Sequence, residues 1–130
     1  MSLAPVDRLF ALRGRPPFDR VGLSELAAIA ARMAERHYPA GTPLVLAGSP
    51  VDDLLVVVYG EALRADGRPA PAVLGLPGLL FGLRPDAAVV AGPAGATALA
   101  LGREHLFTVI GACPELLAGV LAMADGEAFR

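Results

Sequence analysis

The sequence predicts a single, mainly β domain in which short strands form a closed or two-layered structure flanked by helices. Short apolar runs in the middle of the chain are rich in branched residues and separated by glycine and proline, which is typical of strands and turns. Apolar residues at helical spacing occur near both termini. Because 130 residues support one hydrophobic core and no long linker divides them, we expect one domain over 1–130.

Two helices are predicted before the strands. Apolar spacing places the first over about 4–13, and Gly14 ends it. The second should cover about 23–36, with Ser24 as its N-cap. The expected apolar stripes are Val6, Leu9 and Phe10, then Leu26, Ile29, Ala30 and Met33. The charged residues expected to face solvent on the second helix are Glu25, Arg32, Glu35 and Arg36.

The β-structure is predicted over about 37–102. Two apolar runs, 44–47 and 54–59, are interpreted as strands joined by a tight turn, since Gly48, Ser49 and Pro50 lie between them. The second run contains consecutive valines and is too short for a typical helix. We therefore expect it to be a strand buried on both faces, at the centre of the core.

Further along the chain, Asp66-Gly67 indicates a hairpin between strands at 61–64 and 71–76. The uncharged stretch 87–102 is long enough to raise the question of a membrane helix, but glycine and proline at 92, 93 and 95 break it. Strands joined by a turn fit this stretch better, and no membrane association is expected.

The C-terminal part is predicted to be helical over about 103–124. Pro114 lies where a first-turn proline is tolerated, so a second helix should begin there. The apolar stripes of the two helices are Leu106, Phe107 and Ile110, and Leu116, Leu117, Val120 and Leu121.

Composition excludes several classes of protein. A formal charge of −2 offers no attraction for a polyanion, so we expect no direct nucleic-acid binding. Cys113 is the only cysteine, which excludes a disulfide within the chain and favours a reducing cytoplasm. The start of the chain lacks the apolar segment of a secretory signal. All basic residues are arginine, which suggests a GC-rich bacterial coding sequence.

Residue patterns typical of catalysis or metal binding are sparse. His105 and Cys113 lie eight positions apart across a helix break, and a metal held by both would still lack two ligands. We expect an exposed histidine and a buried thiol instead. Asp52-Asp53 is interpreted as a turn with solvated carboxylates. With no Ser-His-Asp grouping, no phosphate-binding glycine loop and only two histidines, neither a hydrolase nor a cupin-like metalloenzyme is expected.

An ordered set of short motifs resembles the cyclic-nucleotide-binding domain found in catabolite activator-like regulators and kinase regulatory subunits. The set comprises Tyr38, Ala40-Gly41, Ala47-Gly48, Asp52-Asp53, Tyr59-Gly60, Pro77-Gly78 and Phe81-Gly82. This resemblance covers most of the chain. It implies a double-stranded β-helix, or jelly-roll-like β-roll, with N-terminal and C-terminal flanking helices. It also implies that the C-terminal helices relay ligand binding to an attached effector domain.

The resemblance places a ligand-binding cassette after Phe81-Gly82, and this sequence departs from it. The family has a glutamate there for the ribose hydroxyl, a small helix facing the phosphate, and then an arginine; here Leu83 follows, and leucine accepts no hydrogen bond. Alignment of Ala87-Ala88 with the next strand puts Pro85 at the arginine position, with Arg84 one position early. The spacing also leaves no room for the small helix. The degenerate pocket therefore comprises Phe81, Gly82, Leu83, Arg84, Ala87 and Ala88. An ion pair between Arg84 and Asp86 across the loop would contribute little if it is exposed.

The sequence thus predicts a non-catalytic regulatory or interaction module that does not bind cyclic AMP or cyclic GMP in the usual way and carries no cofactor or metal. Its expected partner is an effector domain, another protein, or a second copy bound through the helix at 115–123. The alternative is a sensor domain of a transcription regulator or other effector protein, for a cyclic nucleotide or another small molecule. With Leu83 in the lining and only Arg84 charged, such a cavity suits an apolar or small anionic ligand.

Overall fold

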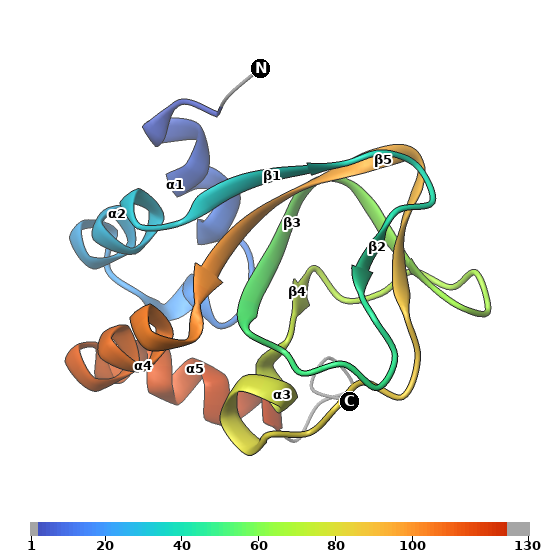
Figure 1. Cartoon of the computed structure of the whole chain (residues 1–130). Coiled ribbons are helices and arrows are strands. Elements are labelled where there is room, and N and C mark those ends of the chain that lie inside the picture. The colour runs from blue at the N-terminus through green and yellow to red at the C-terminus, as the bar shows by residue number, and fades with distance from the viewer. Residues whose placement is uncertain (1–2, 125–130) are drawn as a thin grey trace.

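Six helical segments and five strands make up the structure, a computed structural model that describes residues 3–124, with side chains to residue 122. Helices α1, α2, α4 and α5 gather on one side of the strands, and the short α3 lies below them (Figure 1). The helical segments are α1 (Pro5–Arg13), η1 (Phe18–Arg20), α2 (Leu23–Ala31), α3 (Leu76–Phe81), α4 (Arg103–Ala112) and α5 (Pro114–Ala124). The strands are β1 (Ala34–Tyr38), β2 (Pro43–Val45), β3 (Asp53–Arg64), β4 (Val73–Leu74) and β5 (Val89–Gly102).

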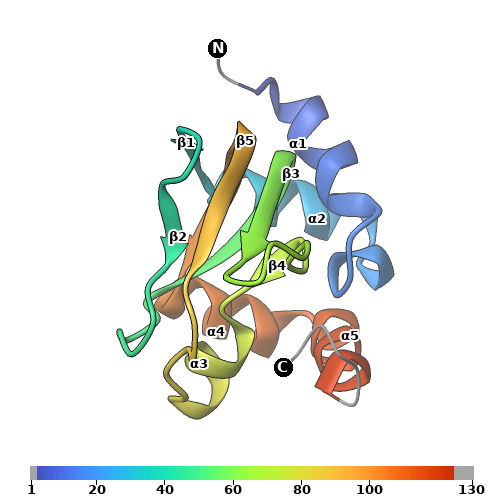
Figure 2. The ribbon, with the colours of Figure 1, turned by 90° about the vertical axis from the view of Figure 1, so that its right-hand side faces the viewer.

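Two long antiparallel strands, β3 and β5, form the frame of the roll. Asp53 pairs with Gly102 at one end of this ladder, and Arg64 pairs with Val89 at the other. The opposite edge of β5 binds β1 along one half and β2 along the other, while β4 pairs with β3. The view in Figure 2 shows the strands curling away from the helices. This arrangement confirms the predicted β-roll with flanking helices.

The side chains of β3 point alternately to its two faces, and each face packs into a separate part of the core. Successive side chains of a strand point to opposite faces, and residues 54–58 are all buried. Leu54, Val56 and Val58 pack with residues of α1, α2, α4 and α5, whereas Leu55 and Val57 pack inside the roll with a set of small residues. The expectation of a strand buried on both faces is therefore confirmed. The small residues on the inside are Ala62, Ala91, Ala96, Ala98 and Ala100.

Two glycines allow β3 and β5 to bend together. Gly60 has φ +70° and Gly95 has φ +76°, a backbone region that side chains disfavour. A Cβ atom on Gly60 would lie 2.1 Å from the carbonyl oxygen of Gly95. The pairing register of β3 shifts on both sides of this point. The close approach of these two backbones is what curves the sheet into a roll.

Four predicted elements differ from the structure. The strand expected at 71–76 is reduced to Val73–Leu74, and Leu76 begins α3. The helix expected over 23–36 ends at Ala31, because residues 34–38 pair with β5 as strand β1. The strands near 44–47 and 54–59 do not pair with each other, since β2 and β3 both bind β5. The stretch 87–102 contains no turn, and its glycines lie within the single bent strand β5. The Asp66-Gly67 hairpin is present, with Ala70 N–H donating to the Ala62 carbonyl at 2.8 Å.

Most of the apolar stripe residues that the helical periodicity predicts to be buried are buried in the structure. Leu26, Ile29 and Ala30 of α2 are buried, and so is Met33 beyond the end of this helix. Leu106 of α4 and Leu116 and Val120 of α5 are buried as well. In α1, however, Val6 and Phe10 are exposed and Leu12 is buried instead, while Gly22 rather than Ser24 is the N-cap of α2. Within the described residues, no single helix is long and apolar enough to cross a membrane. Only the bent pair of α4 and α5 taken together reaches the required length and composition.

Candidate functional site

A cavity of about 470 Å³ lies in the roll, where the start of β5, strand β4 and helix α3 meet the loop at 82–88. Its volume is in the usual range for small-molecule sites. Three of its lining residues are charged, namely Arg64, Arg84 and Asp86. All others are apolar or glycine: Val45, Val51, Ala70, Pro71, Val73, Leu74, Gly75, Pro77, Gly78, Leu83, Pro85, Ala87, Ala88 and Val89. The cavity therefore has an apolar body with a few charged groups.

One wall of the cavity is fixed by close packing and by hydrogen bonds from α4. Gly78 in α3 approaches Val51 so closely that a Cβ atom on the glycine would lie 2.6 Å from the Cβ of Val51. Arg103, the first residue of α4, donates from Nη2 to the Val51 carbonyl at 3.1 Å and to the Gly78 carbonyl at 3.4 Å. The Arg103 backbone N–H donates to the Asp52 carbonyl at 3.0 Å. The wall and the C-terminal helices are thus joined directly.

The structure brings together four of the six predicted site residues. Leu83, Arg84, Ala87 and Ala88 line the cavity, and the first three of them are also exposed to solvent. Phe81 and Gly82 do not line it. Arg84 donates from Nη1 to the Gly48 carbonyl at 3.0 Å. The expected Arg84–Asp86 ion pair is absent from the described residues. The Arg84 guanidinium is therefore bound to the backbone of the segment between β2 and β3.

The segment after Phe81-Gly82 contains no helical turn before β5 begins. A short helix is present, but it is α3, which ends at Phe81 and has Gly82 as its C-cap. The predicted strand at 71–76 overlaps the first residue of this helix, and no helix is predicted there from the sequence. Pro77 in the first turn and the spacing of Leu76, Leu79 and Leu80 are the signals that could have identified it.

The predicted pocket omits two charged residues that line the cavity, Arg64 and Asp86; the sequence suggests Asp86 only as an ion-pair partner of Arg84. Arg64 ends β3, and Asp86 lies in the loop before β5. The pairing of Arg64 with Val89 brings the end of β3 beside this loop. No local pattern indicates that residues so far apart in the chain share one cavity.

The remaining candidates for chemistry are structural. Asp53 binds Arg36, with 3.0 Å between Oδ2 and Nη2, and is therefore not a freely solvated carboxylate. Cys113 is buried, and loss of hydration raises the pKa of its thiol. His105 is exposed on α4, and no group of three or more potential metal ligands is found among the described residues.

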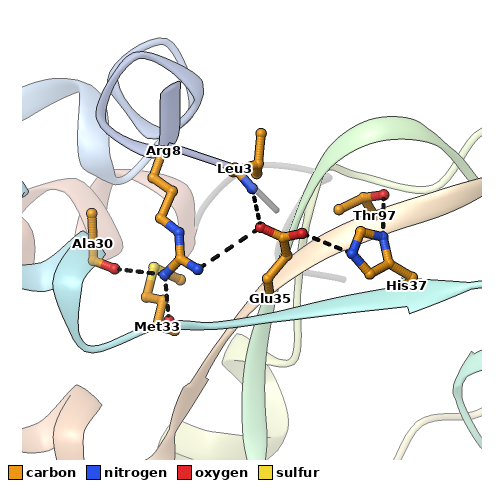
Figure 3. A network of polar contacts seen from close by, with 7 residues as sticks. All are labelled: Leu3, Arg8, Ala30, Met33, Glu35, His37 and Thr97. Atoms are coloured by element: carbon orange, nitrogen blue, oxygen red, sulfur yellow. Dashed lines mark hydrogen bonds and ion pairs between the residues drawn. The ribbon is translucent and has the colours of Figure 1, made fainter. Parts of the chain in front are cut away.

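Glu35 is the centre of a polar network that joins α1 to β1 (Figure 3). It was expected to face solvent, but only 8% of its side chain is exposed. Oε1 accepts the Leu3 N–H at 2.6 Å and lies 3.8 Å from Arg8, while Oε2 lies 2.7 Å from His37 Nε2. The Leu3 N–H lowers the pKa of Glu35 most, His37 and Arg8 lower it further, and burial opposes them. Arg8 also donates to the Met33 carbonyl at 2.7 Å, beyond the end of α2.

Known structures share this fold, although no protein-family model and no curated protein matches the sequence. A cyclic-nucleotide-binding domain from Methylobacillus flagellatus has a TM-score of 0.70 and 21% identity, covering 90% of this chain and 71% of that one. The regulatory domain of Toxoplasma gondii PKA, solved with cAMP, has a TM-score of 0.69 and 22% identity over 81% of this chain. This chain spans only 44% of that protein.

These likenesses show the class of fold: the chain has the fold of a cyclic-nucleotide-binding domain, as the sequence motifs predict. A third similar structure is the N-terminal domain of a transcriptional regulator from Streptomyces coelicolor. It has 26% identity and a TM-score of 0.68, covering 86% of this chain and 85% of that domain.

Proposed function

We propose that this chain is a non-catalytic regulatory module whose pocket does not bind cyclic AMP or cyclic GMP in the usual way. The observation that carries the proposal is Leu83, which lines the cavity where the resemblance places a carboxylate for the ribose. The lack of a helical turn in the following loop supports it. A buried ribose and phosphate without partners would each cost free energy on binding.

Isothermal titration calorimetry with cyclic AMP and cyclic GMP tests this proposal. We expect no saturable heat at micromolar concentrations of the nucleotide. The Toxoplasma gondii PKA regulatory domain, which was solved with cAMP, is the positive control under the same buffer conditions. Micromolar binding of either nucleotide, abolished by Arg84→Gln, would overturn the proposal, because Arg84 would then be holding the phosphate.

A second candidate is a sensor domain for another small molecule, and the retained cavity favours it. A sensor requires a cavity that accommodates its ligand, and the cavity of about 470 Å³ is large enough for a small molecule. A module that only binds other proteins does not require such a cavity. The fold is shared with regulatory domains of kinases and transcription regulators, which supports either role. A bacterial, cytoplasmic regulator is the setting that we propose for both.

Helices α4 and α5 are the surface that we propose for contact with an effector domain, a partner protein or a second copy. Phe107, Leu117 and Leu121 are large apolar residues that remain exposed on them. The predicted dimer helix at 115–123 includes Met123, whose side chain lies outside the described residues. Light scattering of Leu117→Glu, with Leu23→Glu on α2 as the matched control, tests self-association. A dimer that persists in Leu117→Glu would exclude this surface.

A further inference from the structure

We propose that the cavity binds a small organic monoanion with an apolar body, and that Arg64 contacts its anionic group together with Arg84. This inference rests on the proposed function, since it assigns a ligand class to the pocket that we propose is closed to cyclic nucleotides. Three features carry it: the position of Arg64, the balance of charge in the lining, and the chemistry of the remaining walls.

Arg64 is held at the cavity by the backbone on both sides. Its backbone N–H donates to the Arg68 carbonyl at 2.8 Å, and its own carbonyl accepts the Gly67 N–H at 2.9 Å. Pairing with Val89, another lining residue, fixes the end of β3 against the start of β5. The base of the Arg64 side chain therefore has a defined place in the cavity wall.

The guanidinium of Arg64 has no hydrogen bond or ion pair with any residue in the range 3–122. The acidic residue nearest in sequence, Asp66, is already engaged by Arg68. Its Oδ2 lies 3.6 Å from Arg68 Nε, and its Oδ1 accepts the Arg68 N–H at 2.9 Å. Arg64 is exposed, so its donors face solvent and are accessible to a ligand. A guanidinium binds a carboxylate through two parallel hydrogen bonds.

The charges of the lining favour a single negative charge on the ligand. Two arginines and one aspartate give a formal charge of one positive unit. Asp86 has no ion-pair partner among the described residues and therefore repels a dianion such as a phosphate monoester. A carboxylate satisfies Arg64 and Arg84 without a second charge facing Asp86.

The rest of the lining favours an apolar body rather than a sugar. Apart from the three charged residues, no lining side chain carries a hydroxyl, amide, carboxylate or imidazole. A ligand rich in hydroxyl groups would lose water there without regaining hydrogen bonds. Methylene or aromatic groups instead gain about 25 cal/mol for each Å² that they bury.

Titrations followed by ¹H–¹⁵N NMR with octanoate, octanamide and octylamine test this assignment, because the three probes share one alkyl chain and differ in charge. We expect octanoate to bind about tenfold more tightly than octanamide, with shifts at residues 83–89, and octylamine to bind most weakly. Arg64→Gln should remove this preference, whereas Arg64→Lys should retain part of it. The matched control is Arg20→Gln, since Arg20 is exposed in η1 and does not line the cavity.

Equal binding of octanoate and octanamide, or unchanged octanoate affinity in Arg64→Gln, would overturn the inference. A preference for octylamine would do the same and would assign recognition to Asp86. An NMR spectrum of each variant in the absence of ligand verifies that it is folded. Competition by cyclic AMP at micromolar concentration would instead overturn the proposed function, whatever the outcome with octanoate, so the two failures are distinguishable.

Discussion

Arg103 donates from Nη2 to the carbonyl oxygen of Val51 at 3.1 Å, and this contact joins the first residue of α4 to the cavity wall. Arg103→Met should therefore loosen α3 and the segment before β3, and lower stability by about 1 kcal/mol, since the side chain is partly exposed. Hydrogen exchange should accelerate near residues 51 and 78. The same substitution at Arg20, which contacts neither segment, should leave that exchange unchanged.

The bend of the roll predicts a steric cost at Gly60. A side chain there meets both an unfavourable φ and the Gly95 carbonyl 2.1 Å away, so Gly60→Ala should destabilise the protein by about 3 kcal/mol or more. Gly41 also has a positive φ of +79° but open space around it. Gly41→Ala should therefore cost about 1 kcal/mol. Urea denaturation measures the free energy of unfolding of both variants. Equal destabilisation by Gly60→Ala and Gly41→Ala would contradict the close approach of the Gly60 and Gly95 backbones.

The Glu35 network predicts that stability falls at acidic pH. Its pKa is lower in the folded protein than the ordinary value of 4.5, so the folded state gains stability above that value. This gain is lost as the pH falls through the lowered pKa. Glu35→Gln should be less stable than the unmodified chain at pH 7 and nearly equal to it once the carboxylate is protonated. Denaturation curves across this range, with Glu25→Gln as the exposed control on α2, test the effect.

The Cys113 thiol should react slowly in the folded protein. It is 4% exposed, and burial raises its pKa, so little thiolate is present at pH 7. We expect modification by a disulfide reagent to be at least about tenfold slower than in denaturant. A reagent that releases a coloured thiolate makes the reaction measurable by absorbance. Because Cys113 is the only cysteine, this absorbance reports on Cys113 alone. Equal rates in both conditions would show that α5 opens readily.

The sequence by itself determined the class of fold, the terminal helices, the central buried strand and the Asp66-Gly67 hairpin. These depend on local periodicity and turn chemistry, which short stretches of sequence encode directly. It also predicts a departure from the family's cassette at Leu83, since leucine cannot accept a hydrogen bond.

Only the tertiary structure decided the pairing of the strands and the composition of the cavity. Residues 34–36 continue a helical pattern in sequence, yet their backbone pairs with β5 and becomes strand. Arg64 and Arg84 share a cavity because a long ladder brings the end of β3 beside the loop before β5. Such contacts join residues distant in the chain, and their free energy arises only when the partner segment is in place.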